Sequence, residues 1–204
     1  MNASTDFIDA NIAAGRGDKV EVIDVGGERE LTYGEIARNV NRTGHALRRL
    51  GVRPEERVMA LLPDCPEFIY VFFGAIRIGA VAVPVNTLLT PPEYEYLLND
   101  SRARVLVVHQ RFLERIAVIR SRTPHLEHIL VVGEGQYDYA PLADLLDADG
   151  DELAPLDMSE DDAAFWLYSS GTTGFPKGAV HLQHDMRCCA ESVGQGVLGI
   201  TAAD

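Results

Sequence analysis

Four short runs of aliphatic residues recur through the middle of this 204-residue chain, with helix-like segments between them. They cover residues 57–62, 80–85, 105–108 and 129–132. Because polar and apolar residues do not alternate within the runs, the pattern indicates strands that are covered on both faces. Such strands alternating with helices predict an α/β fold, with a mostly parallel sheet covered by helices.

Helix and turn signals surround these runs. Residues 20–24 and 30–31 flank Gly26 and Gly27, which predicts a short hairpin. Thr32 and Glu35 have the spacing of a capping box at the start of a helix, and Gly51 is placed to end that helix. Further helices are predicted from about Pro66, from Pro91, over residues 110–121 and near residues 140–146.

A polar loop follows the apolar run at residues 163–167. Residues 168–178 read Tyr-Ser-Ser-Gly-Thr-Thr-Gly-Phe-Pro-Lys-Gly. Glycines allow backbone N–H groups to turn toward an anion. Hydroxyl groups donate to phosphate oxygens, and a lysine supplies positive charge. The loop therefore favours a polyphosphate ligand.

This loop differs from a Walker loop, which ends in Gly-Lys-Ser/Thr and enters a helix. Here Pro176 precedes Lys177, and a proline disfavours helical geometry at the residue before it. We therefore expect a second strand over residues 178–182 and a strand–loop–strand hairpin. A plain turn rich in glycine and hydroxyl residues is the alternative, and the ordered run between two apolar strands argues against it.

The loop resembles the phosphate-loop signature of AMP-forming adenylating enzymes, which include acyl-CoA synthetases, luciferases and peptide-synthetase adenylation domains. Other segments resemble further family motifs in the same order, so that the resemblance extends from about Leu31 to Asp204. Residues 179–186 are most similar to the benzoate-CoA ligase branch. The supporting segments are residues 31–36, 51–58, 79–86 and 93–101.

The resemblance implies a two-step reaction that uses ATP, Mg²⁺ and coenzyme A. A small carboxylate, here an aromatic acid, becomes an acyl-adenylate with release of pyrophosphate, and coenzyme A then takes the acyl group. Lys177 is the catalytic candidate and also contributes phosphate-binding charge. The other phosphate-binding candidates are Ser169, Ser170, Gly171, Thr172, Thr173 and Gly174.

Members of that family are well over twice as long as this chain. We therefore expect residues 1–204 to be a partial N-terminal large domain, lacking the adenine-binding remainder and the C-terminal domain, and to be inactive alone. We assign no residue to a metal, because the family's metal-binding glutamate belongs to a later motif. The alternatives are a peptide-synthetase adenylation domain, a fatty acyl-CoA ligase, or a non-catalytic nucleotide-binding module.

The net charge and the lack of targeting signals limit which binding partners and which cellular location are expected. With 31 acidic and 18 basic side chains, the net charge is −13, which disfavours binding to nucleic acid or to an anionic membrane. The first residues lack the basic start and apolar core of a signal peptide. The apolar stretch at residues 68–76 is too short to span a membrane. Three cysteines without metal-ligand spacing favour reduced thiols, so a cytoplasmic protein is expected.

Two other patterns have simpler explanations. His181 and His184 lie three residues apart beside the loop, and lining a pocket is one interpretation, but local hydrogen bonds are favoured. Without a nearby third ligand the two histidines are weak evidence for zinc. Residues 194–199 match Gly-x-Gly-x-x-Gly. They follow a helix-like segment rather than a strand, so we predict the end of a helix and a turn instead of a dinucleotide site.

Overall fold

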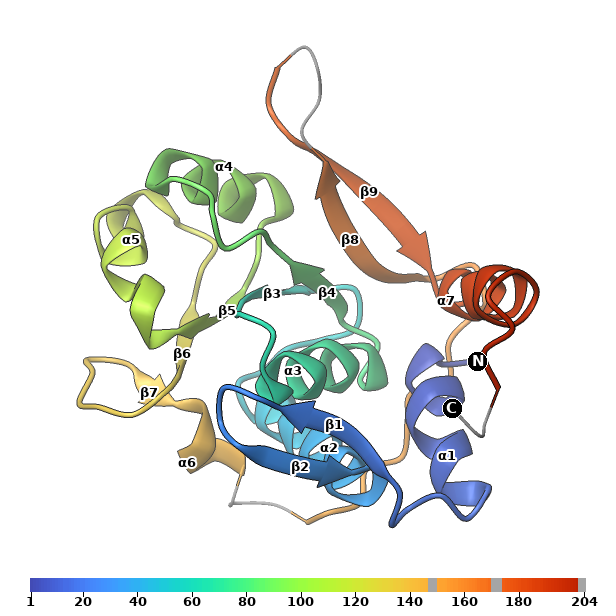
Figure 1. Ribbon diagram of the computed structural model, residues 1–204. Coiled ribbons are helices and arrows are strands. Elements are labelled where there is room, and N and C mark those ends of the chain that lie inside the picture. Colours follow the sequence, from blue (N-terminus) through green and yellow to red (C-terminus); the bar gives the residue numbers. More distant parts are fainter. Residues whose placement is uncertain (147–149, 170–173, 202–204) are drawn as a thin grey trace.

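The computed structural model describes residues 1–146, 150–169 and 174–201. Its centre is a seven-stranded sheet with the order β7-β6-β5-β3-β4-β8-β9 (Figure 1). Neighbouring strands are parallel except for β8 and β9, which are antiparallel, so the predicted mostly parallel sheet is confirmed. The strands are β3 (Arg57–Leu61), β4 (Val81–Pro84), β5 (Val105–His109), β6 (His128–Val132), β7 (Ala140–Pro141), β8 (Ala163–Ser169) and β9 (Lys177–Leu182).

Helices cover both faces of this sheet. On β3, Val58 and Ala60 belong to one buried cluster, whereas Met59 and Leu61 belong to the other. Helices α2, α3 and α6 pack on the first face, and α4 and α5 pack on the second. Alternate residues of one strand thus enter two cores, which explains why its sequence is continuously apolar. The helices are α2 (Tyr33–Arg49), α3 (Pro66–Arg77), α4 (Pro91–Ser101), α5 (Leu113–Ala117) and α6 (Leu142–Leu146).

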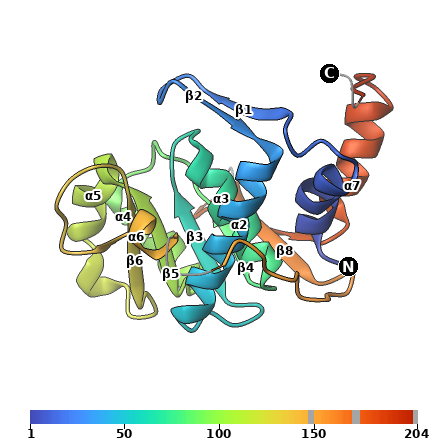
Figure 2. The same ribbon diagram turned by 90° about the horizontal axis from the view of Figure 1, so that it is seen from below.

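The N-terminal part forms a separate hairpin and a helical segment. Strands β1 (Val20–Asp24) and β2 (Arg29–Thr32) pair antiparallel, as predicted. The Thr32 backbone N–H donates to Glu35 over 2.8 Å and the Glu35 N–H donates to the Thr32 hydroxyl over 3.2 Å, which confirms the capping box. Thr5–Asp9 (η1) and Ala10–Ala13 (α1) form the helical segment, which lies beside α7 (Asp185–Cys189) in both views (Figures 1 and 2).

Two predicted helices differ from the structure. Residues 110–121 form three short pieces, Gln110–Phe112 (η2), α5 and Arg120–Arg122 (η3), instead of one helix. This interrupted path still buries Phe112, Ile116 and Ile119 in one core. In the segment 140–146, the first two residues form strand β7, and only Leu142–Leu146 is helical. Pro141 is tolerated in β7 because that strand is at the sheet edge.

Candidate phosphate-loop site

Strands β8 and β9 form the predicted hairpin around the polar loop. Their register pairs Phe165 with His181, Leu167 with Ala179 and Ser169 with Lys177. Since β8 runs parallel to β4, its last residue, Ser169, lies toward the carboxyl end of the parallel strands. Ligands of open α/β sheets bind at that edge. The described ends of the hairpin, Ser169 and Lys177, therefore lie toward the carboxyl ends of the parallel strands, where a ligand is expected.

The described candidates lie at the two ends of the loop. Ser169 and Lys177 are register partners and are both exposed. Gly174 has a φ of +139°, a conformation that residues with side chains rarely adopt, so a glycine is needed at this position. Four further predicted residues lie outside the described residues, and their assignments stay predictions: Ser170, Gly171, Thr172 and Thr173.

The base of the hairpin packs against the buried cluster on the face of the sheet that α2, α3 and α6 cover. The Phe165 ring stacks on the His181 ring with centroids 4.5 Å apart and also contacts Phe72 of α3 at 5.3 Å. Gln183, which is fully buried, accepts a hydrogen bond from the backbone N–H of Ala3 over 2.8 Å. Its side-chain amide donates to the Ala163 carbonyl over 3.4 Å. The hairpin base is therefore joined to the N-terminal segment.

The outer part of the hairpin contacts α4. No pattern in the sequence predicted this contact. The Tyr168 hydroxyl donates to the Asp100 carboxylate over 2.6 Å. The Phe175 ring stacks on Tyr96 with centroids 4.7 Å apart and an interplanar angle of 20°. Tyr168 and Asp100 are 68 positions apart, so no local sequence signal could have linked them.

The environment on this side of the hairpin is partly apolar. Burial, followed by the neighbouring Asp100 carboxylate, raises the pKa of Tyr168, so its hydroxyl stays protonated and able to donate. Trp166 packs against the second core, with the Arg57 guanidinium 5.7 Å from its ring centroid. Such a cation–π contact helps to fix the first strand of the hairpin.

His181, near the end of β9, and His184, just after it, make local contacts, as predicted. Nδ1 of His184 lies 2.9 Å from the Glu160 carbonyl oxygen, and its Nε2 lies 3.2 Å from the Asp185 carboxylate. Nδ1 of His181 is 3.4 Å from the same carboxylate. The Gly-x-Gly-x-x-Gly segment continues from the helical segment Ala190–Gln195 (η4) into a turn, which also agrees with its prediction.

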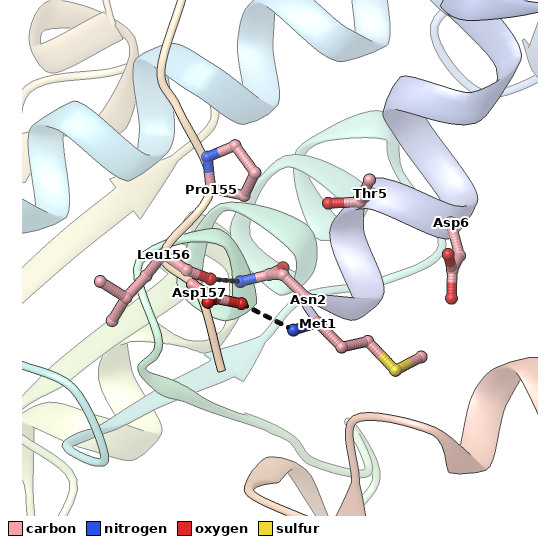
Figure 3. Close-up of a pocket in the computed structure, with 7 residues that line it drawn as sticks. All are labelled: Met1, Asn2, Thr5, Asp6, Pro155, Leu156 and Asp157. Atoms are coloured by element: carbon pink, nitrogen blue, oxygen red, sulfur yellow. Dashed lines mark hydrogen bonds and ion pairs between the residues drawn. The ribbon is translucent and has the colours of Figure 1, made fainter. Parts of the chain in front are cut away.

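A small pocket of about 210 Å³ opens between the N-terminus and the connector that precedes β8 (Figure 3). The Asn2 side-chain amide donates to the Leu156 carbonyl over 3.1 Å, and the Met1 amino group lies 2.8 Å from the Asp157 carboxylate. None of the described loop candidates lines this pocket, whose walls are formed by packing of the N-terminal segment.

Comparison with known proteins identifies the family. The model of the AMP-binding enzyme family matches residues 10–200. The chain belongs to the AMP-binding enzyme family. It is 44% identical over 196 residues to a 4-hydroxybenzoate–CoA/benzoate–CoA ligase from Rhodopseudomonas palustris, covering 96% of this chain and 36% of that protein.

Two further relatives agree with this family membership. A benzoate–CoA ligase from Thauera aromatica is 44% identical over 204 residues, covering 100% of this chain and 38% of that protein. The crystal structure of the anthranilate CoA ligase AuaEII in complex with anthranoyl-AMP superposes with a TM-score of 0.94 and 42% identity, covering 98% of this chain and 38% of that one. The chain thus spans less than two fifths of the length of these relatives.

No helix in the described part of the chain is long and apolar enough to cross a membrane. Within the same residues, no group of three or more His, Cys, Asp or Glu side chains is placed to hold a metal ion. Cys65, Cys188 and Cys189 are free thiols, and the last two are exposed.

Proposed function

We propose that this chain is the N-terminal part of the large domain of an ATP-dependent acid–thiol ligase that acts on an aromatic acid. The observation that carries the proposal is the pairing of Ser169 with Lys177 on a hairpin at the carboxyl edge of the sheet. This pairing brings a hydroxyl-bearing and a cationic residue to the two ends of a loop rich in serine, threonine and glycine.

In the proposed first step, a carboxylate oxygen attacks the α-phosphorus of ATP. An acyl–oxygen–phosphorus bond forms, the bond to the β-phosphate oxygen breaks, and pyrophosphate leaves. Negative charge grows on the departing pyrophosphate, and donors arranged in advance stabilise it. We assign hydrogen bonding to the loop hydroxyl and backbone groups and charge neutralisation to Lys177. The hydrogen-bonding residues are Ser169, Ser170, Gly171, Thr172, Thr173 and Gly174.

In the proposed second step, the thiol of coenzyme A attacks the acyl carbonyl and AMP leaves. The names of the relatives support an aromatic acid as the acyl donor, since they are ligases of benzoate, 4-hydroxybenzoate and anthranilate. We assign no residue of this chain to Mg²⁺, because the family's metal-binding glutamate belongs to a later motif. Free thiols support our further proposal of a cytoplasmic location, which cell fractionation would test.

Calorimetric titration of Mg-ATP into the protein extended to the length of its relatives tests the phosphate-binding role. The chain has two lysines, Lys19 and Lys177, so charge-matched variants are available. We expect Lys177→Ala to weaken binding at least about tenfold, because a charge-assisted contact is lost. Lys19→Ala should bind Mg-ATP as tightly as the unsubstituted protein, the parent, does. Equal binding by both variants and the parent would contradict the role of Lys177.

A panel of acids tests the substrate class. The readout is acid-dependent pyrophosphate release by the protein extended to the length of its relatives. We expect release with benzoate and hydroxybenzoates and little with fatty acids. A preference for fatty acids or amino acids would favour the other adenylating enzymes. Mg-ATP binding without release for any acid would favour a non-catalytic module.

A further inference from the structure

The outer half of the β8–β9 hairpin has little support from the sheet itself. Among the described residues, β4 pairs with β8 at a single position, Ala82 with Phe165. The ladder between β8 and β9 nevertheless continues to the pair formed by Ser169 and Lys177. The last residues of β8 and the first of β9 therefore extend beyond β4, as Figure 1 shows. An isolated two-stranded hairpin is at best marginally stable in water.

Helix α4 supplies two side chains to this unsupported part. Tyr96 and Asp100 are four positions apart, so they lie on the same face of the helix. Asp100 accepts the hydrogen bond from Tyr168, the residue before Ser169 at the end of β8. Tyr96 stacks on Phe175, two residues before Lys177 at the start of β9. One helix face therefore contacts the residues on both sides of the loop.

The two contacts differ in chemistry and complement each other. The hydrogen bond at 2.6 Å joins a phenol to a carboxylate, and bonds to ionised acceptors are stronger than neutral ones. The second contact brings together two aromatic rings, although Phe175 remains 71% exposed. An exposed aromatic ring stacked on a helix restricts the loop arm without requiring a buried core.

We propose that Tyr96 and Asp100 are positioning residues that hold the phosphate loop for nucleotide binding. This inference rests on the proposed function of the loop. Through Tyr168 and Phe175, the α4 pair (Tyr96 and Asp100) sets the direction in which Ser169 and Lys177 leave the sheet. Binding then costs less conformational entropy, because the arms of the loop are already ordered.

Amide hydrogen exchange along β8 and β9 tests whether the α4 pair holds the hairpin. The disrupting variants are Tyr96→Ala and Asp100→Ala. We expect exchange of the β9 amides to accelerate at least about fivefold in each, because local opening becomes easier. Tyr96→Phe keeps an aromatic ring and should resemble the parent. Asp100→Asn keeps an oxygen acceptor without the charge, so its exchange should fall between those of Asp100→Ala and the parent. Unchanged exchange in both alanine variants would overturn the proposal.

Mg-ATP titration tests the positioning role. Affinity should fall about tenfold in Tyr96→Ala and in Asp100→Ala, because the loop must be ordered on binding. Glu95→Gln is the matched control, because Glu95 neighbours Tyr96 but pairs with Arg122, away from the hairpin. Faster exchange with parental affinity would overturn the positioning role and leave the phosphate-binding function intact.

The outcome for the parent protein separates this inference from the proposed function. If the protein extended to the length of its relatives does not bind Mg-ATP, and its Lys177→Ala variant behaves identically, the phosphate-binding function fails and the positioning role fails with it. If the parent binds and Lys177→Ala does not, the function stands, and the α4 variants alone decide the inference. In a double-mutant cycle of Tyr168→Phe with Asp100→Ala, the two changes in the free energy of unfolding should be non-additive. Additivity would overturn the direct contact.

Discussion

Gly74 in α3 approaches Thr43 in α2 so closely that a Cβ atom on residue 74 would lie 2.9 Å from the Thr43 Cβ. The same atom would lie 3.1 Å from the Val40 carbonyl oxygen. Neither neighbour is the end of a flexible side chain, so neither can move away cheaply. Two of the helices that cover one face of the sheet, α2 and α3, therefore pack through a residue that has no side chain.

We expect Gly74→Ala to destabilise the protein by about 1–3 kcal/mol, the usual range for overpacking a tight contact. Urea unfolding followed by circular dichroism measures this difference. Gly194→Ala is the control, since a Cβ there meets nothing within 4 Å. That substitution should be neutral or stabilising by up to about 1 kcal/mol. Equal stability of Gly74→Ala and the parent would refute the close contact.

Gln183→Met should destabilise the protein while preserving side-chain size. The change removes the acceptor for the Ala3 N–H, which lies in a buried site. Leaving a buried donor unpaired costs about 1–3 kcal/mol. Gln195→Met, at an exposed position, should change the free energy of unfolding by less than about 0.5 kcal/mol. A similar small effect at both positions would show that the buried hydrogen bond contributes nothing.

Stability should fall as pH rises toward neutrality because of Glu21. Burial raises the pKa of Glu21 from 4.5 to about 7, and its Oε2 is buried with no hydrogen-bond partner. The folded state therefore binds more protons than the unfolded state between these values. This contribution is fully present below pH 4.5 and is lost as pH rises through about 7.

The variant Glu21→Gln tests this pH dependence. The amide cannot ionise, so thermal unfolding of this variant should lack the Glu21 contribution to pH dependence. Relative to the parent, the variant should gain stability between pH 5 and pH 7.5, values chosen on either side of the shifted pKa. A constant difference in melting temperature across that interval would exclude the raised pKa.

If Ser169 makes the hydrogen bond to phosphate that we propose, Ser169→Ala should weaken Mg-ATP binding about tenfold or more, because a bond to a charged group is lost. Titration calorimetry measures the dissociation constant. Ser192→Ala serves as the control, because the Ser192 hydroxyl donates to the Cys188 carbonyl in a separate segment. Parental affinity in Ser169→Ala would remove this residue from the proposed phosphate site.

Much of the fold could be predicted because its signals are local. The Thr32 and Glu35 spacing identified the start of α2, and the continuous aliphatic runs identified β3 to β6. Over residues 110–121 the helical character was predicted but the breaks between its pieces were not, and Ile116 and Ile119 are buried in this segment. Such burial depends on strands far away in sequence, so periodicity alone could not locate the breaks.

The candidate site also combines features that the local sequence predicts with features that depend on tertiary packing. Local sequence signals were enough to predict the hairpin, since Pro176 and the flanking apolar runs restrict the backbone geometry. The support that α4 gives this hairpin through Tyr96 and Asp100 depends instead on tertiary packing. The reason is physical: these contacts join elements whose relative positions are set by strand order and core packing, which no local sequence pattern specifies.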